Sequence, residues 1–256
     1  MKRTALAVAL VVATMLVPAP AARAQEGCQG SVPPAAAERQ ARRVVAELRT
    51  ELAAVEDEIR HAPFLDALEQ GTASRDLLRA LAGEQYHILR SDLRSMAALV
   101  ARVEPRQSLF FQDLLAGERI ALGMLLDFAG ALGWDEADLA AYEPRPPGQT
   151  YPNYVTRLAH HGSGAAAAAS FLINFPVFGE NTGRVRDALQ AHYGLDATAT
   201  AFFDFFATPV PGFEEAALEV IAAGFERCEC AREVKRSARL LQAYERDFWY
   251  AVGEAP

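Results

Sequence analysis

Three stretches of the chain place a glutamate inside an apolar stripe at helical spacing. In residues 77–99, apolar side chains recur every three or four positions, and Glu84 lies between Leu81 and Ile88 in that stripe. His87 follows three residues later and therefore shares the same side of the helix. Burying an ionised side chain without a partner costs several kcal/mol. We therefore expect Glu84 and His87 to face each other, a third polar group or a wet cavity.

The same pattern occurs in two later stretches. Glu118 interrupts the apolar stripe of residues 109–132, and Glu245 interrupts that of residues 229–252. No stretch sustains the period-two alternation of a strand and no internal repeat is visible, so the predicted class is all-α, a single helical bundle. Helical bundles build sites from the inward side chains of facing helices, so three such glutamates predict one shared polar cavity.

The first 24 residues have the pattern of an export signal. Lys2 and Arg3 precede an apolar run at residues 5–17, and small residues before Gln25 predict cleavage after Ala24. The apolar run is shorter than the roughly 20 residues that a membrane-spanning helix needs. We therefore expect an exported protein, periplasmic or secreted, with no stable membrane insertion after cleavage.

The predicted remainder is a linker at residues 25–35 and one helical domain at residues 36–253. Removing the basic residues of the signal would take the formal charge from −8 to −11. Such a charge opposes the phosphate backbone of nucleic acids. We therefore expect a small-molecule ligand and no nucleic acid as partner, and the sequence leaves a homo-oligomer open.

The chain contains three cysteines, Cys28, Cys228 and Cys230. In the oxidising compartment that export implies, one disulfide and one remaining thiol are expected. The sequence does not indicate which two cysteines pair.

Several spaced motifs resemble the TenA/thiaminase II family and its PqqC-like relatives. The segment HAPFLDALEQGTASRDLLRALAGEQYHIL at 61–89 is similar to a family segment with an HPF start, a glycine turn and an Asp-x-x-Tyr helix. YERDFWYA at 244–251 is similar to the closing Glu-x-x-Phe-Trp motif, and TYPNYVTRLA and ALQAHYGL lie between them in the family's order. The resemblance implies a heme-oxygenase-like helical fold with an internal pocket for an aminopyrimidine or thiamin-like ligand.

The resemblance also implies roles for individual residues. Glu245 falls on the catalytic glutamate of the family, and Tyr151 and Tyr193 fall on tyrosines of its pocket. Glu84 stands where thiaminase II has aspartate, and His87 stands where it has tyrosine. The predicted site therefore has two catalytic carboxylates and five ligand-binding residues, namely Glu245 and Glu84, and His87, Glu118, Tyr151, Asn174 and Tyr193.

The chain departs from the family at the nucleophile, because the position of the family's cysteine holds Asn174. An amide cannot replace a thiolate as a nucleophile. Acid–base hydrolysis of a C–N bond by carboxylates is the activity that we expect instead. A non-catalytic binding or regulatory protein is the alternative, although no helix-turn-helix pattern or basic face is visible.

A third interpretation is a degenerate metal-dependent oxidase of the same fold. Diiron oxidases take Glu-x-x-His from one helix and Glu from the next, which Glu84, His87 and Glu118 match. Their His-x-x-x-Asp-x-x-His segment aligns with three apolar residues that begin at Phe206, and residues 36–60 lack the proximal histidine of heme oxygenase. The sequence therefore predicts no resident cofactor and leaves room only for one weakly held metal on Glu84, His87 and Glu118.

Overall fold

The computed structural model describes residues 31–253, and this part of the chain is helical without any strand. The helices are α1 (Pro34–Arg60), α2 (Pro63–Glu69), α3 (Arg75–Arg102), α4 (Pro105–Ala131), α5 (Glu136–Ala141), the short η1 (Pro147–Gln149), α6 (Thr150–His161), α7 (Gly164–His192), α8 (Ala201–Ala207), α9 (Phe213–Glu226) and α10 (Ala231–Gly253). The predicted all-α class is confirmed. The predicted export signal lies outside the described residues, and none of the described helices is long and apolar enough to cross a membrane.

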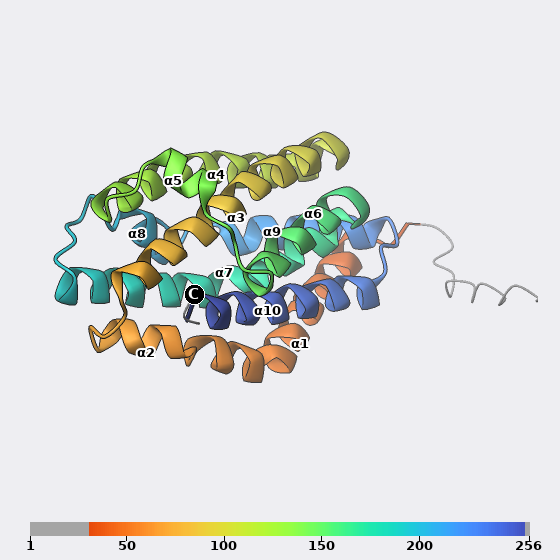
Figure 1. Ribbon diagram of the computed structural model, residues 1–256. Coiled ribbons are helices and arrows are strands. Elements are labelled where there is room, and N and C mark those ends of the chain that lie inside the picture. The colour runs from red at the N-terminus through yellow and green to blue at the C-terminus, as the bar shows by residue number, and fades with distance from the viewer. Residues whose placement is uncertain (1–30, 254–256) are drawn as a thin grey trace, which may run out of the picture.

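Helix α7 lies at the centre of the bundle and packs against α10, α8, α9, α2, α1 and α6 (Figure 1). Its residues 164–174 are all buried, which their mostly small side chains permit. At one contact, a Cβ atom added to Gly224 of α9 would lie only 2.6 Å from the Cβ atom of Ala165. The alanine run therefore allows neighbouring helices to approach closely, as its small side chains indicate.

Helix α7 also continues through a proline. Pro176 removes one backbone hydrogen bond, and a proline inside a helix usually kinks or ends it. The helix instead runs unbroken to His192. Pro176 lies on an exposed side of α7, and buried residues on both sides of it hold the helix in the core. Tertiary packing therefore outweighs the local cost of the proline.

Helices α3 and α4 form a long antiparallel hairpin joined by only Val103 and Glu104. The Ser74 side chain caps α3 by accepting a hydrogen bond from the Leu77 N–H group at 3.2 Å. In Figure 1 this hairpin lies along one side of the bundle, above α7 and α10. The segment 142–149, which we call the strap, runs from α5 to α6 and packs through η1 against α3 and α10.

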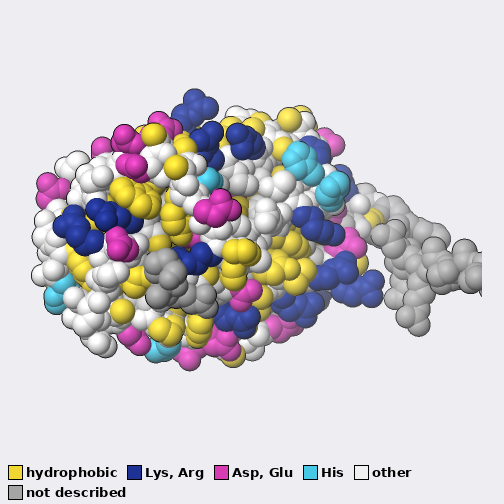
Figure 2. All heavy atoms as spheres, in the orientation of Figure 1, with side chains coloured by type: hydrophobic (Ala, Val, Ile, Leu, Met, Phe, Trp, Pro, Cys, Tyr) yellow, Lys and Arg dark blue, Asp and Glu magenta, His cyan; other side chains and the backbone are white. Residues whose placement is uncertain are grey.

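The described surface mixes both charge signs. Lys and Arg side chains alternate with Asp and Glu over the face shown in Figure 2. Many of the basic groups pair with acids, such as Lys235 with Glu47 and Glu51 at 2.7 Å each. That face therefore offers no continuous basic surface for a phosphate backbone.

The cysteines near the start of α10 differ in state. Cys228 is disulfide-bonded, whereas Cys230 is a free, partly buried thiol. The pairing of Cys228 with Cys230 is therefore excluded, in agreement with the expected single disulfide and one remaining thiol.

Gly179 of α7 is expected to be intolerant of a side chain. A Cβ atom there would lie 2.8 Å from the carbonyl oxygen of Phe206, so Gly179→Ala should push α8 away from α7 and lower the free energy of unfolding by about 1–3 kcal/mol. Gly183→Ala is the matched control on the same helix, because its Cβ atom would meet Ala207 at an ordinary 3.5 Å. Urea denaturation of both variants tests this, and an equal effect of the two would contradict it.

Candidate functional site

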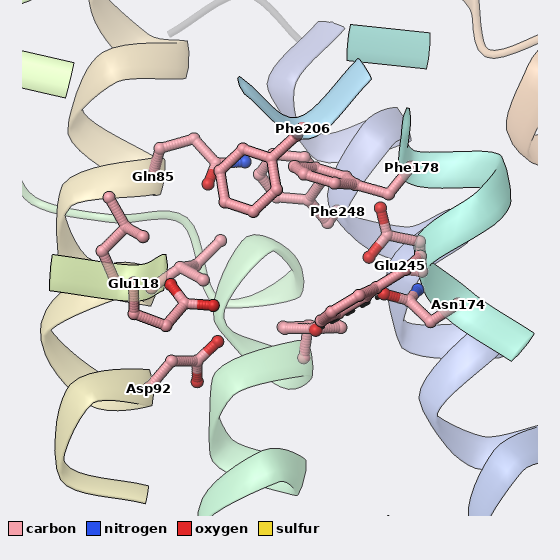
Figure 3. Close-up of a pocket in the computed structure, with 12 residues that line it drawn as sticks. Gln85, Asp92, Glu118, Asn174, Phe178, Phe206, Glu245 and Phe248 are labelled. Atoms are coloured by element: carbon pink, nitrogen blue, oxygen red, sulfur yellow. Dashed lines mark hydrogen bonds between the residues drawn. The ribbon is translucent and has the colours of Figure 1, made fainter. Parts of the chain in front are cut away.

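A cavity of about 30 Å³ lies between the α3–α4 hairpin and the helices α6, α7, α8 and α10. This free space is enough for a few water molecules. Twelve residues line it, and none of them is Lys, Arg or His: Gln85, Ile88, Leu89, Asp92, Glu118, Tyr151, Asn174, Phe175, Phe178, Phe206, Glu245 and Phe248 (Figure 3). The cavity therefore combines acidic and amide groups with aromatic rings and has no positive charge of its own.

Glu245 reaches the cavity from α10 and is only 3% exposed. The indole Nε1 of Trp249, one helical turn later, donates a hydrogen bond to its Oε1 at 2.7 Å. Burial raises the pKa of Glu245 to about 7, although hydrogen bonds from Asn174 and Trp249 act in the opposite direction. Glu245 is therefore divided between its charged and neutral forms near neutral pH.

Asn174 of α7 links Glu245 to a buried amide and phenol network. The Tyr151 hydroxyl donates to Asn174 Oδ1 at 3.4 Å, and Asn174 Nδ2 donates to Gln242 Oε1 at 3.3 Å. Burial raises the pKa of Tyr151 well above its usual value, and the nearby carboxylates Asp92, Glu245 and Glu118 raise it further. Tyr151 therefore remains a neutral hydrogen-bond donor.

Asp92 and Glu118 lie on the other side of the cavity, on α3 and α4 (Figure 3). Asp92 is 4% exposed, and its Oδ1 has no hydrogen-bond partner among the described residues. Burial raises its pKa, and the negative charges of Glu118 and Glu245 raise it further. Burial also raises the pKa of Glu118 to about 7. Acidic groups thus face each other across the cavity, and none of the residues that line it is basic.

Glu84 does not line the cavity, which corrects the expectation that it shares a site with Glu118 and Glu245. Its side chain is fully buried and holds the strap instead. Its Oε1 accepts from the Tyr142 hydroxyl at 3.1 Å and from the Arg145 backbone N–H at 2.7 Å, and its Oε2 accepts from Gln149 Nε2 at 2.6 Å. The neighbouring Gln85 lines the cavity. One residue turns a helix by about 100°, so these two side chains face different neighbours.

His87 and Tyr193 also lie away from the cavity lining. His87 Nε2 lies 3.0 Å from the carbonyl oxygen of Tyr142, at the start of the strap. Tyr193 is the C-cap of the unbroken helix α7, about 28 Å along the axis from Asn174 at the helical rise per residue. Tyr193, which the family resemblance placed in the pocket, therefore does not line this cavity.

The described residues include no group of three His, Cys, Asp or Glu side chains placed to hold a metal. Glu84 and His87 contact the strap while Glu118 lines the cavity, so the suggested weak metal site on these three residues is not formed. Phe206, which aligns with a histidine ligand of the diiron oxidases, brings a phenyl ring into the cavity.

Sequence reasoning missed Asp92 and Gln85. Both lie on one face of α3 with Ile88 and Leu89, at spacings of three, four and seven residues. Asp92 follows Ile88 by four positions, so extending the stripe by one turn would have included it. The aromatic lining also has a sequence signal, because Phe206 belongs to the run of four phenylalanines in the segment 202–206.

Carboxyl groups with a pKa near 7 suit two tasks. They can donate or accept protons at neutral pH, where general acid–base catalysis is most efficient. In their ionised form they bind cations, and aromatic faces assist them. The arrangement therefore fits an amine or a protonated heterocycle better than an anion.

The bundle belongs to the class of heme-oxygenase-like helical folds, as predicted. Cyanobacterial heme oxygenase-1 from Synechocystis in complex with heme has a TM-score of 0.58 and 14% identity, over 80% of this chain and 90% of that one. A TenA homologue from P. horikoshii has a TM-score of 0.65 and 14% identity, over 82% and 99%. A TenA homologue from Pseudomonas syringae has a TM-score of 0.71 and 11% identity, over 81% and 91%.

Residues 49–255 match the model of the TENA/THI-4/PQQC family, and the chain therefore belongs to that family. No curated protein is similar enough to the chain to be matched. At the identities above, the solved structures show a shared fold and nothing about the ligand.

Proposed function

We propose that the cavity binds a small nitrogen-containing ligand of the aminopyrimidine type and hydrolyses a C–N bond of it. The observation that carries the proposal is that Glu245 and Glu118, both with pKa values of about 7, line the same cavity from different helices. Membership of the TENA/THI-4/PQQC family supports a small-molecule role for this cavity.

In the proposed reaction, water replaces the amine on a carbon atom of the ligand. Glu245 in its protonated form donates a proton to the leaving nitrogen, which departs with the electron pair of the C–N bond. Glu118 in its ionised form takes a proton from the attacking water, whose oxygen forms the new C–O bond. Tyr151 and Asn174 provide further hydrogen bonds to the ring. No thiol is needed, which agrees with an amide at position 174.

The space for a ring is made by aromatic side chains that move. The free volume of about 30 Å³ is too small for a pyrimidine. Phe178 and Phe206 are only partly buried, and Phe206 lies on a helix of seven residues. We therefore expect these two phenyl rings to move aside when the ligand enters.

Replacing Glu245 by Gln tests this function. The change keeps the shape of the side chain but removes its charge and acidity, so affinity or turnover for an aminopyrimidine should fall at least about tenfold, roughly 1.4 kcal/mol. Calorimetry measures the binding, and ammonia release measures the hydrolysis. Glu219→Gln, on the exposed side of α9, is the control.

The two outcomes separate an enzyme from a binding protein. Binding without ammonia release would leave the alternative of a non-catalytic family member. Equal binding by the Glu245→Gln variant and the wild type would remove Glu245 from the site and contradict the proposed function.

A further inference from the structure

The outer face of α4 exposes apolar side chains. Of the four large apolar side chains that are exposed among residues 31–253, two lie on this helix, Leu109 at 63% exposure and Ile120 at 52%. Ala116 and Gly123 are also exposed. These residues follow one another at spacings of seven, four and three positions, so they form one stripe along the helix, the α4 stripe. In Figure 1, α4 lies along the edge of the bundle opposite α2, where a second molecule can approach it.

Four charged side chains accompany the α4 stripe and have no partner within the described part of the chain. Arg106, Asp113, Arg119 and Asp127 are all exposed. None of them forms a side-chain hydrogen bond or an ion pair with another described residue. Two positive and two negative charges on one helix suit a partner that presents both signs in the reverse order.

The order of these charges makes α4 complementary to itself. In an antiparallel helix pair with a twofold axis, residues at equal distances on either side of the axis lie opposite each other. Asp113 and Arg119 lie three residues on either side of Ala116, and Arg106 and Asp127 lie ten and eleven residues on either side of it. A twofold axis at Ala116 therefore brings each arginine of one copy opposite an aspartate of the other, four ion pairs in all.

The apolar side chains fit the same register. Leu109 and Gly123 lie seven residues on either side of Ala116, so the leucine of one copy faces the glycine of the other. A large side chain opposite a glycine packs as a ridge into a groove, and the alanine on the axis allows the two helices to approach closely. Charge and shape therefore select the same partner, a second copy of this chain.

We propose that α4 is the twofold interface of a homodimer, in which the α4 stripes of two copies pack antiparallel. A helix of 27 residues presents a strip about 40 Å long and about 10 Å wide, roughly 400 Å² of each chain. This is about half of the area that a stable interface buries on each partner, so we expect a dissociation constant in the micromolar range. The inference does not depend on the proposed function.

The test is sedimentation velocity on the full chain, which should pass from monomer to dimer between about 1 and about 200 µM. Asp113→Arg and Arg119→Asp each place like charges opposite each other twice, so each should raise the dissociation constant at least about tenfold. The double variant reverses both members of each pair and should return the constant to within about threefold of the wild type. The two residues are six positions apart on α4, so this rescue requires a second copy.

Glu219→Arg is the matched control, because it reverses an exposed acid on α9 and should leave the dissociation constant unchanged. Circular dichroism should show that all variants fold, since every substituted side chain is exposed. Ala116→Glu provides an independent test, because two carboxylates would meet at the axis and the protein should become monomeric. A wild type that stays monomeric at about 200 µM would overturn the α4 dimer. So would a dissociation constant that ignores both single reversals, or a double variant as weak as either of them.

Discussion

The free energy of unfolding is expected to fall by about 3 kcal/mol between pH 4.5 and pH 8 through Glu245 alone. The pKa of Glu245 is raised from 4.5 to about 7 in the folded protein. Between these values the folded chain holds a proton that the unfolded chain has lost, so the contribution to stability is complete below pH 4.5 and disappears as the pH rises through 7. Glu118 and Asp92, whose pKa values are also raised, act in the same direction.

Glu245→Gln should remove the Glu245 part of this pH dependence. The amide oxygen can still accept the hydrogen bond from Trp249, and the variant should be more stable than the wild type by up to about 3 kcal/mol at pH 8 but not at pH 4.5. Urea denaturation across this pH range measures it. The surface acids with lowered pKa values, such as Glu69 and Glu214, change charge below this window. Parallel curves for the two proteins would show that Glu245 is not desolvated in solution.

Glu84→Ala is expected to cost about 3–4 kcal/mol of stability at pH 7. The change removes the acceptor of three donors at once, from Tyr142, Arg145 and Gln149. Gly148 packs directly against the Glu84 carboxylate, since a Cβ atom added to Gly148 would lie only 2.6 Å from Glu84 Oε2. Shortening Glu84 to alanine therefore also leaves a hole under Gly148. The strap would then lose its main attachment to α3.

Two variants control for this effect. Glu84→Gln keeps the volume of the side chain but places an amide N–H group where the strap also presents hydrogen-bond donors. A smaller loss of stability, about 1–2 kcal/mol, is therefore expected. Glu219→Ala on the exposed side of α9 should change stability by less than about 0.5 kcal/mol. Urea denaturation of all three provides the comparison. A loss below 1 kcal/mol for Glu84→Ala would mean that the strap is held by other contacts.

The helices of this fold were predictable because their apolar periodicity is strong. The N-cap Ser74 and the end of α3 near Val103 agree with the pattern of the sequence. Pro176 by itself would favour a break in α7, but local propensity does not include the tertiary packing that keeps this helix continuous. The family resemblance placed Tyr193 in the predicted pocket, but this residue is the C-cap of α7 and lies far along the helix from Asn174.

The candidate site was only partly predictable, and α3 shows why. A carboxylate in an apolar stripe indicates burial, and Glu84 is indeed fully buried. Helix α3 is covered on one side by the strap and on another by the cavity, so burial alone cannot tell which one a given residue faces. Glu84 and Gln85 are neighbours in sequence but contact different parts of the molecule. Glu118, Asn174 and Glu245 line one cavity, as a shared polar site requires, although α7 is buried on all sides at Asn174 and its pattern alone does not indicate which neighbour that residue faces.

The carboxyl groups of the cavity, whose pKa values burial raises, also offer a way to locate the ligand site without knowing the ligand. Each of them weakens the empty protein at neutral pH, so a population selected only for heat resistance should accumulate neutral residues at Asp92, Glu118 and Glu245. Some residues would be replaced readily in such a selection although the natural protein keeps them. These residues would mark the ligand site, because they lower stability and are needed for binding. A ligand that binds the folded chain and brings positive charge into the cavity would lengthen the lifetime of the folded protein, and protein abundance would then follow ligand supply.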